Sequence, residues 1–187
     1  MLKVELAADP DFQRSFRASL RRRRAEVAFV ILRPGGTVLT TTKTFYPSGI
    51  FRIPTGGVKP GEAVEEALWR EINEETGLDV TGATFAALIE YQLVANGTTV
   101  RFATYLFVVH ASEGVPHCSD PDEDICAFRE LLPAELEAVA VSLSNLGANW
   151  RSWGIWRAIP HRVAAEILMK GNPGPSEVRP VVGTSDQ

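Results

Sequence analysis

The chain has 187 residues, of which 45% are hydrophobic and 22% charged, and its formal net charge is −4 at pH 7. This length and composition are typical of one globular domain with a sizeable core, and we expect a single domain over residues 1–170. The negative charge gives no general reason to expect nucleic-acid binding. Because the sequence shows no apolar segment of signal-peptide or membrane-span length, we expect a cytoplasmic protein without a membrane partner.

The first predicted element is a short amphipathic helix over residues 9–24. Asp9 can cap its first turn, and Phe12, Phe16 and Leu20 recur at intervals of four residues. Consecutive arginines end the segment, and cations are favourable at the C-terminal end of a helix dipole. We therefore expect these arginines to be solvated, with phosphate or an acidic partner as the alternative ligand.

Extended segments then lead to a glycine-rich turn at residues 54–61. The first segment is apolar almost throughout, the second is rich in β-branched residues, and the Pro-Gly-Gly sequence between them indicates a hairpin. Glycines and prolines in the turn interrupt both helices and strands, so we expect no regular structure there. Lys43 and Arg52 flank the turn and are the nearest candidates for binding a polyphosphate. The predicted strands are residues 25–33, 37–44 and 50–53.

A helix from Gly61 to Thr76 is the segment with the clearest chemical content. Its first turn is acidic, which suits the positive end of the helix dipole, and Gly77 is typical of a left-handed C-cap. At about 100° per residue, Glu71 and Glu75 fall on the apolar stripe that should face the core. We therefore expect two carboxylates to be turned toward the protein interior.

These carboxylates need compensation. Glu71, Glu74 and Glu75 are neighbours on the helix surface, where each like-charged pair costs roughly a few tenths of a kcal/mol. Arg70, four residues before Glu74, can offset one charge at most. A buried carboxylate must be protonated, pair with a cation or hold a metal, because an unpaired buried charge costs about several kcal/mol. A divalent ion with oxygen ligands is the simplest compensator.

The segment after this helix predicts a second hairpin and a long acidic loop. Asn96 and Gly97 both tolerate positive φ, and they separate two β-rich runs at residues 84–93 and 98–110. The polar loop at 112–124 has a length that is often functional. A short strand is predicted at 125–129. Cys118 and Cys126 form no metal-type or redox-type pair, so we expect reduced thiols.

The C-terminal part predicts helical structure followed by an irregular tail. A helical stretch begins near Pro133, and a second helix is expected over residues 150–170, kinked or restarted at Pro160. Tryptophans recur in it at helical spacing, which favours packing, with base stacking by one indole as the alternative. Residues 171–187 lack periodicity, and we expect them to be disordered. The tryptophans are Trp150, Trp153 and Trp156.

The segment 56–78 resembles the signature of the Nudix hydrolase family. That signature is Gly, five residues, Glu, seven residues, Arg-Glu, an aliphatic residue, any residue, Glu-Glu, any residue, Gly and an aliphatic residue. Every specified position is present, and a fixed spacing of this length makes a chance match rare. The matching residues are Gly56, Glu62, Arg70, Glu71, Ile72, Glu74, Glu75, Gly77 and Leu78.

The resemblance implies an α/β fold, a Nudix-like α/β/α sandwich with a mixed β-sheet. It implies a metal-dependent hydrolase that cleaves the pyrophosphate bond of a nucleoside diphosphate linked to another moiety, by attack of water on phosphorus. Mg²⁺ or Mn²⁺ would be held by Glu71, Glu74, Glu75 and the Gly56 carbonyl, with Arg70 orienting a carboxylate. The catalytic base remains open between Glu71, Glu74 and a loop carboxylate.

Three further implications of the resemblance concern neighbouring groups. Family members often carry an additional carboxylate on a loop, and Glu123 or Asp124 can serve here. Glu62 would brace the glycine-rich turn. Many relatives form homodimers, and we keep a homodimer as an option beside the small nucleotide-type substrate. The alternative function is a non-hydrolytic nucleotide-binding or sensing module on the same fold, which a degraded signature would have favoured.

Overall fold

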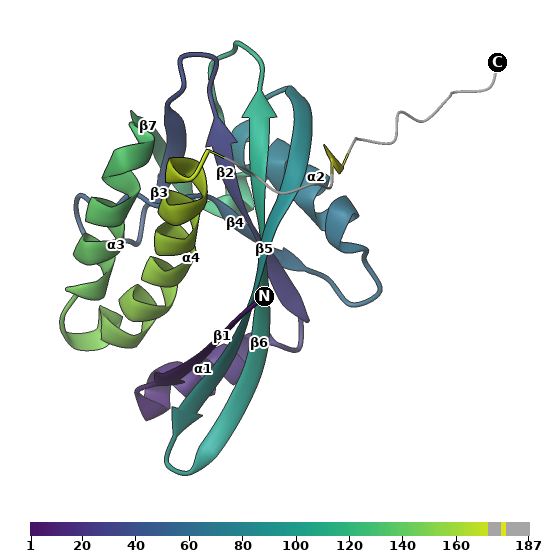
Figure 1. The fold of residues 1–187 in the computed structure, drawn as a ribbon. Coiled ribbons are helices and arrows are strands. Elements are labelled where there is room, and N and C mark those ends of the chain that lie inside the picture. Colours follow the sequence, from purple (N-terminus) through teal and green to yellow (C-terminus); the bar gives the residue numbers. More distant parts are fainter. Residues whose placement is uncertain (172–176, 179–187) are drawn as a thin grey trace.

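The computed structural model describes residues 1–171 and 177–178, and within these residues eight strands form one mixed sheet (Figure 1). The strand order is β1-β5-β6-β2-β3-β7, while β4 pairs with β2 and β8 with β5. The pairs β1–β5 and β2–β6 are parallel and the others are antiparallel. The strands are β1 (Leu2–Ala7), β2 (Ala25–Leu32), β3 (Val38–Lys43), β4 (Thr55–Val58), β5 (Val80–Ala95), β6 (Thr98–Ala111), β7 (Ile125–Leu131) and β8 (Glu177–Val178).

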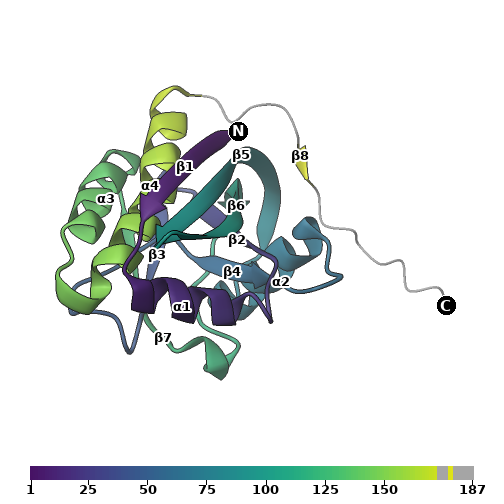
Figure 2. The ribbon, with the colours of Figure 1, turned by 90° about the horizontal axis from the view of Figure 1, so that it is seen from below.

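Helices cover both faces of this sheet. Helix α2 lies on one face, and α3 and α4 lie side by side on the other (Figure 1). Helix α1 packs against the far end of the β5–β6 ribbon, as the view from below shows (Figure 2). This arrangement confirms the predicted α/β/α sandwich. The helices are α1 (Pro10–Ser19), α2 (Val64–Thr76), α3 (Leu136–Ser144) and α4 (Arg151–Met169), with short 3₁₀ turns at Pro121–Glu123, Pro133–Glu135 and Ala148–Trp150.

Strand β2 is buried on both faces, as its continuous apolar run predicts. Val27 and Phe29 pack toward α2, whereas Ala28 and Val30 belong to the cluster formed with α3 and α4. The strand sits at the centre of the sheet and pairs with β3, β4 and β6. The two hydrophobic layers therefore meet at β2, which also holds β4, where the signature segment begins.

The N-terminal region differs from the prediction in two ways. Residues 2–7 form the edge strand β1, which sequence analysis did not predict, and the helix ends at Ser19 instead of continuing to residue 24. The helix stops early because the chain must turn to enter β2: the Arg24 amide already donates a hydrogen bond to the Val58 carbonyl at 2.9 Å. The predicted helix 9–24 is therefore too long at its C-terminal end.

The prediction that residues 54–61 contain no regular structure is also partly wrong. Thr55–Val58 is strand β4, paired antiparallel with β2, and Gly56 lies opposite Val27. The predicted strand at 50–53 is instead a single bridge between Thr41 and Arg52. Glycines suit a strand where another element approaches closely. A Cβ on Gly56 would lie 1.7 Å from Cδ of Glu71, so the missing side chain makes room for the carboxylate of α2.

The remaining elements agree more closely with expectation. The β5–β6 hairpin turns at Asn96 and Gly97, with φ of 48° and 69°. Helix α4 runs through Pro160 without restarting. Cys118 and Cys126 are free thiols. Apart from residues 171 and 177–178, the predicted disordered tail lies outside the described residues. Within the described part, no helix combines the length and the apolar character needed to cross a bilayer.

Candidate active site

Helix α2 fixes the direction of the acidic side chains. It begins at Val64, later than predicted, where the Glu66 carboxylate accepts a hydrogen bond from the Ala63 amide at 3.0 Å. It ends at Gly77 in the left-handed conformation, as predicted. Glu71 is 4% exposed and Glu75 is fully buried. The core-facing placement derived from the helical period is confirmed.

Arg70 connects the helix to the strand before it. Its guanidinium donates to Glu62 at 2.7 Å, to Glu71 at 2.8 Å and to Glu74 at 2.7 Å, and also to the Gly57 carbonyl at 2.9 Å. Arg70 thus contacts three carboxylates, whereas the sequence suggested one. These contacts raise the pKa of Arg70, with the Glu62 hydrogen bond as the largest cause, and they lower the pKa of Glu62. Glu62 in turn accepts from the Lys59 amide at 2.8 Å, so it fixes the turn before α2.

Three carboxylates converge in a way that suits a metal ion. Oxygens of Glu71, Glu74 and Glu123 all lie within 4.8 Å of one another. Among the described residues, Oε2 of Glu71 is buried without a hydrogen-bond partner, and burial raises the pKa of this carboxyl although Arg70 opposes the effect. Carboxylate oxygens are the ligands that Mg²⁺ and Mn²⁺ prefer. The donor set therefore fits such an ion, and the loop contributes Glu123 to it, while Asp124 is not a member of the group.

The acidic loop reaches this group because it is bonded to the end of α2. The His117 amide donates to the Thr76 carbonyl at 2.9 Å, and the Ser119 amide donates to the Glu74 carbonyl at 3.0 Å. The Ser119 hydroxyl adds a bond to the Asn73 carbonyl at 2.8 Å. The Glu74 and Thr76 carbonyls lie in the last turn, where a helix leaves carbonyls without partners, whereas the Asn73 carbonyl also accepts from the Gly77 amide at 3.0 Å. These hydrogen bonds hold the loop against the end of α2, which places Glu123 close to Glu71 and Glu74.

Lys43 and the buried Glu75 lie next to the three converging carboxylates. The Lys43 ammonium lies 2.6 Å from Oε2 of Glu123 and 3.5 Å from Oε1 of Glu75. Neither oxygen of Glu75 has a hydrogen-bond partner among the described residues. Burial raises the pKa of Glu75 to about 8, although Lys43 and Arg52 lower it. Glu75 thus lies beside the three-carboxylate group, and Lys43 connects the two.

A cavity of about 280 Å³ opens next to these side chains. Glu71 and Glu123 form part of its wall together with the predicted cations Lys43 and Arg52. Arg23, from the arginine run that was expected to be solvated, also lines the cavity, with a side chain that is 22% exposed and lies 3.5 Å from Glu26. Tyr46 and Arg157 were not predicted, because they come from segments far apart in the chain and carry no local motif. The lining residues are Arg23, Lys43, Phe45, Tyr46, Arg52, Thr55, Gly56, Gly57, Glu71, Glu123, Trp153 and Arg157.

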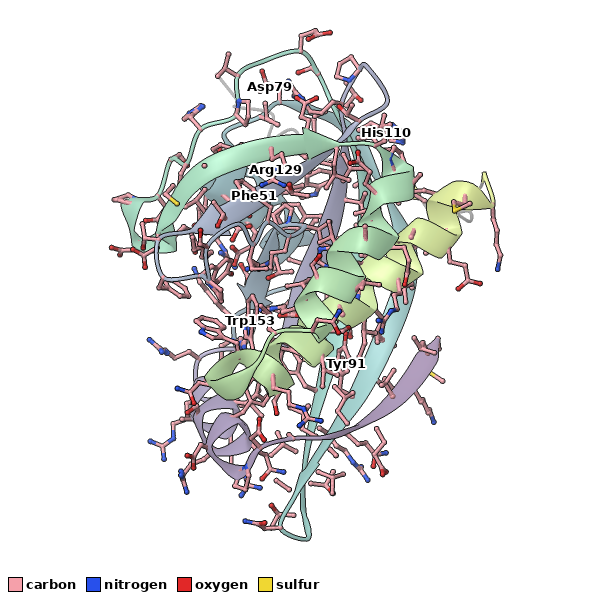
Figure 3. All side chains as sticks on the ribbon, turned by 90° about the vertical axis from the view of Figure 1, so that its left-hand side faces the viewer. Phe51, Asp79, Tyr91, His110, Arg129 and Trp153 are labelled. Atoms are coloured by element: carbon pink, nitrogen blue, oxygen red, sulfur yellow. The ribbon has the colours of Figure 1, made fainter. Side chains whose placement is uncertain are left out.

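The tryptophans of the C-terminal region have different surroundings. Trp156 is 2% exposed and packs edge-on against Phe16 with ring centroids 4.9 Å apart. Trp153, labelled on α4 in Figure 3, contacts the cavity and stands 5.0 Å from the Tyr46 ring centroid. The packing interpretation therefore holds for Trp156. Trp153 has a position from which it can also contact a bound molecule.

His161 is bonded to the segment that precedes β4. It is buried in α4, its Nε2 accepts a hydrogen bond from the Ile53 amide at 3.0 Å, and its Nδ1 lies 2.8 Å from the Arg157 carbonyl. Burial lowers the pKa of His161 to about 3, so the ring is neutral. These contacts give His161 a structural role, because they join α4 to the segment before β4.

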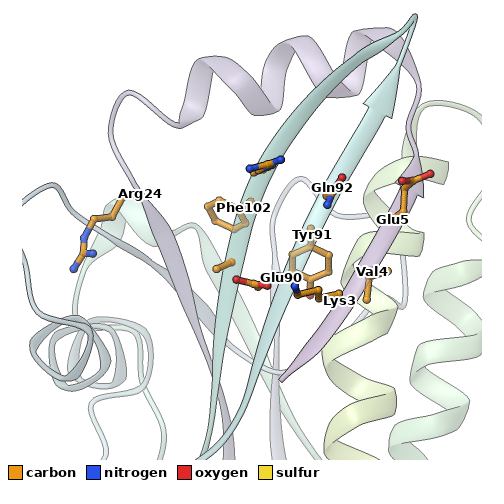
Figure 4. A pocket seen from close by; sticks show the side chains of 10 residues that line it. Lys3, Val4, Glu5, Arg24, Glu90, Tyr91, Gln92 and Phe102 are labelled. Atoms are coloured by element: carbon orange, nitrogen blue, oxygen red, sulfur yellow. The ribbon is translucent and has the colours of Figure 1, made fainter.

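A larger hollow, of about 690 Å³, lies elsewhere on the molecule (Figure 4). Its walls come mainly from β1, β5 and β6, and none of the signature glutamates lines it. Charges of both signs are mixed there: Lys3, Glu5 and Glu90 are among its residues. Volume alone therefore does not locate the chemistry, and the smaller cavity beside α2 is the candidate active site.

Comparison with known proteins agrees with the fold. The family model described as "NUDIX domain" matches residues 22–147. The chain therefore belongs to the Nudix family.

Curated relatives and solved structures add detail. A protein of Mycobacterium tuberculosis named "Putative 8-oxo-dGTP diphosphatase 2" is 35% identical over 96 residues, which is 50% of this chain and 65% of that protein. The E. coli dihydroneopterin triphosphate pyrophosphohydrolase superposes with a TM-score of 0.54 at 19% identity, covering 80% of this chain and 98% of the other. A MutT NUDIX hydrolase from Burkholderia pseudomallei gives 0.50 at 25% identity, with 78% and 97% covered.

Proposed function

We propose that this protein is a metal-dependent hydrolase that cleaves the pyrophosphate bond of a nucleoside diphosphate linked to another moiety. The observation that carries the proposal is that Glu71, Glu74 and Glu123 converge, and that Glu71 and Glu123 line a cavity that also presents Lys43 and Arg52. Carboxylates for a divalent ion and cations for phosphate oxygens thus border one space. This combination suits phosphoryl chemistry.

The residues that would hold Mg²⁺ or Mn²⁺ are the three converging glutamates, with Glu75 and the Gly56 carbonyl as further candidates. A bound divalent ion would neutralise phosphate charge and lower the pKa of a water molecule. The buried, unpartnered oxygens of Glu71 and Glu75 support this assignment, because such oxygens are costly to leave without a cation.

Other side chains would accept a proton from the attacking water and bind the phosphate oxygens. Glu71 is our candidate for the proton acceptor, because burial raises its pKa toward the range in which a carboxylate is an effective base. Arg70 donates a hydrogen bond to Oε1 of Glu71 and leaves Oε2 without a hydrogen-bond partner among the described residues. Lys43 and Arg52 would bind the phosphate oxygens, which orients the phosphorus for attack by water.

The other end of the substrate would contact the aromatic side chains. Tyr46 and Trp153 line the same cavity and offer ring faces to a planar base. The relative from M. tuberculosis is named for a purine nucleoside triphosphate, which is a nucleoside diphosphate joined to a phosphate. We therefore include 8-oxo-dGTP with sugar-linked and nucleoside-linked diphosphates among the candidate substrates.

The test is product analysis of these compounds with Mg²⁺ in water enriched in ¹⁸O. Wild-type protein should release a phosphorylated product that carries the label, and Glu74→Gln should lower turnover by at least about 100-fold, since it removes a metal ligand. Glu65→Gln is the matched control, because Glu65 is exposed on the same helix. Turnover that persists in EDTA or in Glu71→Gln/Glu74→Gln protein would refute the proposal, and nucleotide binding without any product would favour the sensing module.

A further inference from the structure

Strand β1 forms one end of the sheet and has a neighbouring strand on only one side. It pairs in parallel with β5 through residues 2–7, and among the described residues no strand lies beyond it (Figure 2). Val4 and Leu6 anchor the strand, because they pack into the hydrophobic cluster formed by side chains of α1, β5, β6 and α4. The fold therefore holds β1 in place while its outer edge lacks a partner strand.

The backbone groups of alternate β1 residues point away from β5. The amide of Ala8, the residue after the strand, donates a hydrogen bond to the Val94 carbonyl of β5 at 2.9 Å. Because peptide groups alternate in direction along a strand, Lys3, Glu5 and Ala7 direct their N–H and C=O groups outward. Within the described part of the chain, none of these outward groups has a backbone partner. Such an edge is suited to pairing with another strand.

The side chains of β1 carry charges of both signs on one face and apolar groups on the other. Lys3 and Glu5 are exposed and border the hollow of about 690 Å³ (Figure 4). Lys3 lies opposite Glu90 of β5, whereas Glu5 lies opposite the neutral Gln92, so β5 places no cation directly opposite the Glu5 carboxylate. On the apolar face, Leu2 is 40% exposed.

One antiparallel register of two β1 strands places unlike charges opposite each other. With the two-fold axis at Val4, Lys3 of each copy lies opposite Glu5 of the other copy. Leu2 then lies opposite Leu6 on the second face, so its exposed side chain gains an apolar neighbour. Moving the axis by one residue, to Lys3 or to Glu5, would place two like charges opposite each other, which destabilises a strand pair. The charge pattern therefore favours the register centred on Val4.

We propose that a second copy of this chain docks on β1, and that the two β1 strands pair antiparallel about Val4 and join two sheets into one. Lys3 and Glu5 of different copies would exchange about four backbone hydrogen bonds, because their N–H and C=O groups face outward. Their side chains would form an ion pair on each side of the axis. The same surface serves both copies, as a two-fold symmetric interface requires. Because β1 does not line the cavity beside α2, the inference goes beyond the proposed hydrolysis and does not depend on it.

The experiment is sedimentation equilibrium of the full chain from about 10 µM to about 1 mM, since an interface built on one short strand belongs to the weak class. We expect the average mass to rise with concentration from 20.5 kDa toward twice this value. Lys3→Glu and Glu5→Lys should each weaken the dimer at least about 10-fold, because each variant places like charges opposite each other. An equimolar mixture of the two variants should dimerise again, since unlike charges then meet across the interface.

A control and a second measurement assign the effect to β1. Glu65→Lys alters the net charge as much as Glu5→Lys does, at an exposed position of α2, and it should dimerise like wild type. Hydrogen exchange should slow at the amides of Lys3 and Glu5 as the protein concentration rises. The Ala8 amide is bonded to β5 and should show no such dependence.

Three results would overturn the proposal: wild type that stays monomeric throughout, a dimer that neither charge variant weakens, and a mixture of the variants that stays monomeric. Should a charge variant fail to fold, Glu5→Pro decides the question. Proline at this position removes an N–H that faces outward and keeps the bonds to β5, as is tolerated at a sheet edge. Glu5→Pro should therefore be folded and monomeric, and a dimer of wild-type affinity would refute the pairing of β1.

Discussion

Replacing Glu75 with glutamine should stabilise the metal-free protein, and the gain should grow with pH. Burial raises the pKa of Glu75 to about 8 from an ordinary value of 4.5. Between these values the unfolded chain releases the proton while the folded protein keeps it, so wild-type stability falls as the pH rises through this window. Glutamine has nearly the same size and stays uncharged, so the variant does not undergo this loss.

The size of the effect follows from the same two pKa values. Stability should fall by about 1.4 kcal/mol for each pH unit, which gives about 5 kcal/mol between pH 4.5 and 8 as an upper limit, because the folded protein can relax around the charge. Wild type and Glu75→Gln should therefore have similar stability near pH 5 and differ most near pH 8.

Urea unfolding in EDTA at pH 5, 6.5 and 8 measures this difference. Glu65→Gln, an exposed substitution on the same helix, should show no comparable dependence on pH. A difference between wild type and Glu75→Gln that stays constant over this range would refute the reasoning. Greater stability of wild type at pH 8 would mean that Lys43 holds Glu75 ionised in the folded protein.

Two more substitutions test the contacts around the metal-binding group. Gly56→Ala should lower Mn²⁺ affinity at least about 10-fold, measured by calorimetry, because the new Cβ would displace the Glu71 carboxylate that supplies one of few ligands. Gly82→Ala, where no atom lies within 4 Å of the added carbon, should leave the affinity unchanged. Lys43→Met should raise Mn²⁺ affinity several-fold in the absence of nucleotide, since it removes an ammonium that competes for Glu75 and Glu123, and it should weaken nucleotide binding. Lower metal affinity in Lys43→Met, or the same change in Lys3→Met, would contradict this.

The part of the site that lies on one helix was predictable from the sequence. The helical period placed Glu71 and Glu75 toward the interior because, at about 100° per residue, they fall on the same face of the helix as its apolar residues. The β5–β6 hairpin was predictable for a similar reason, since Asn96-Gly97 determines the turn by local backbone preference. These features depend on residues that are close in sequence.

Features that depend on distant segments were not predictable in the same way. Glycines normally interrupt strands, yet β4 forms because β2 supplies a partner and Glu71 requires space beside Gly56. Lys43 was expected to be a phosphate ligand, but its contacts with Glu75 and Glu123 arise from the packing of β3 against α2 and the acidic loop. Arg23, Arg52 and Arg157 come from three separate parts of the chain, and nothing in the local sequence indicates that they line one cavity.

The bonds between the acidic loop and the end of α2 have a consequence for local unfolding. The amides of His117 and Ser119 are held by carbonyls of the helix, so the loop cannot open while those bonds remain. Their hydrogen exchange should therefore follow the same opening free energy as the last turn of α2, as in one cooperative unit. Fraying of that turn would also release Glu123 from Glu71 and Glu74. The affinity for a metal would therefore depend on the opening free energy of the last turn of α2.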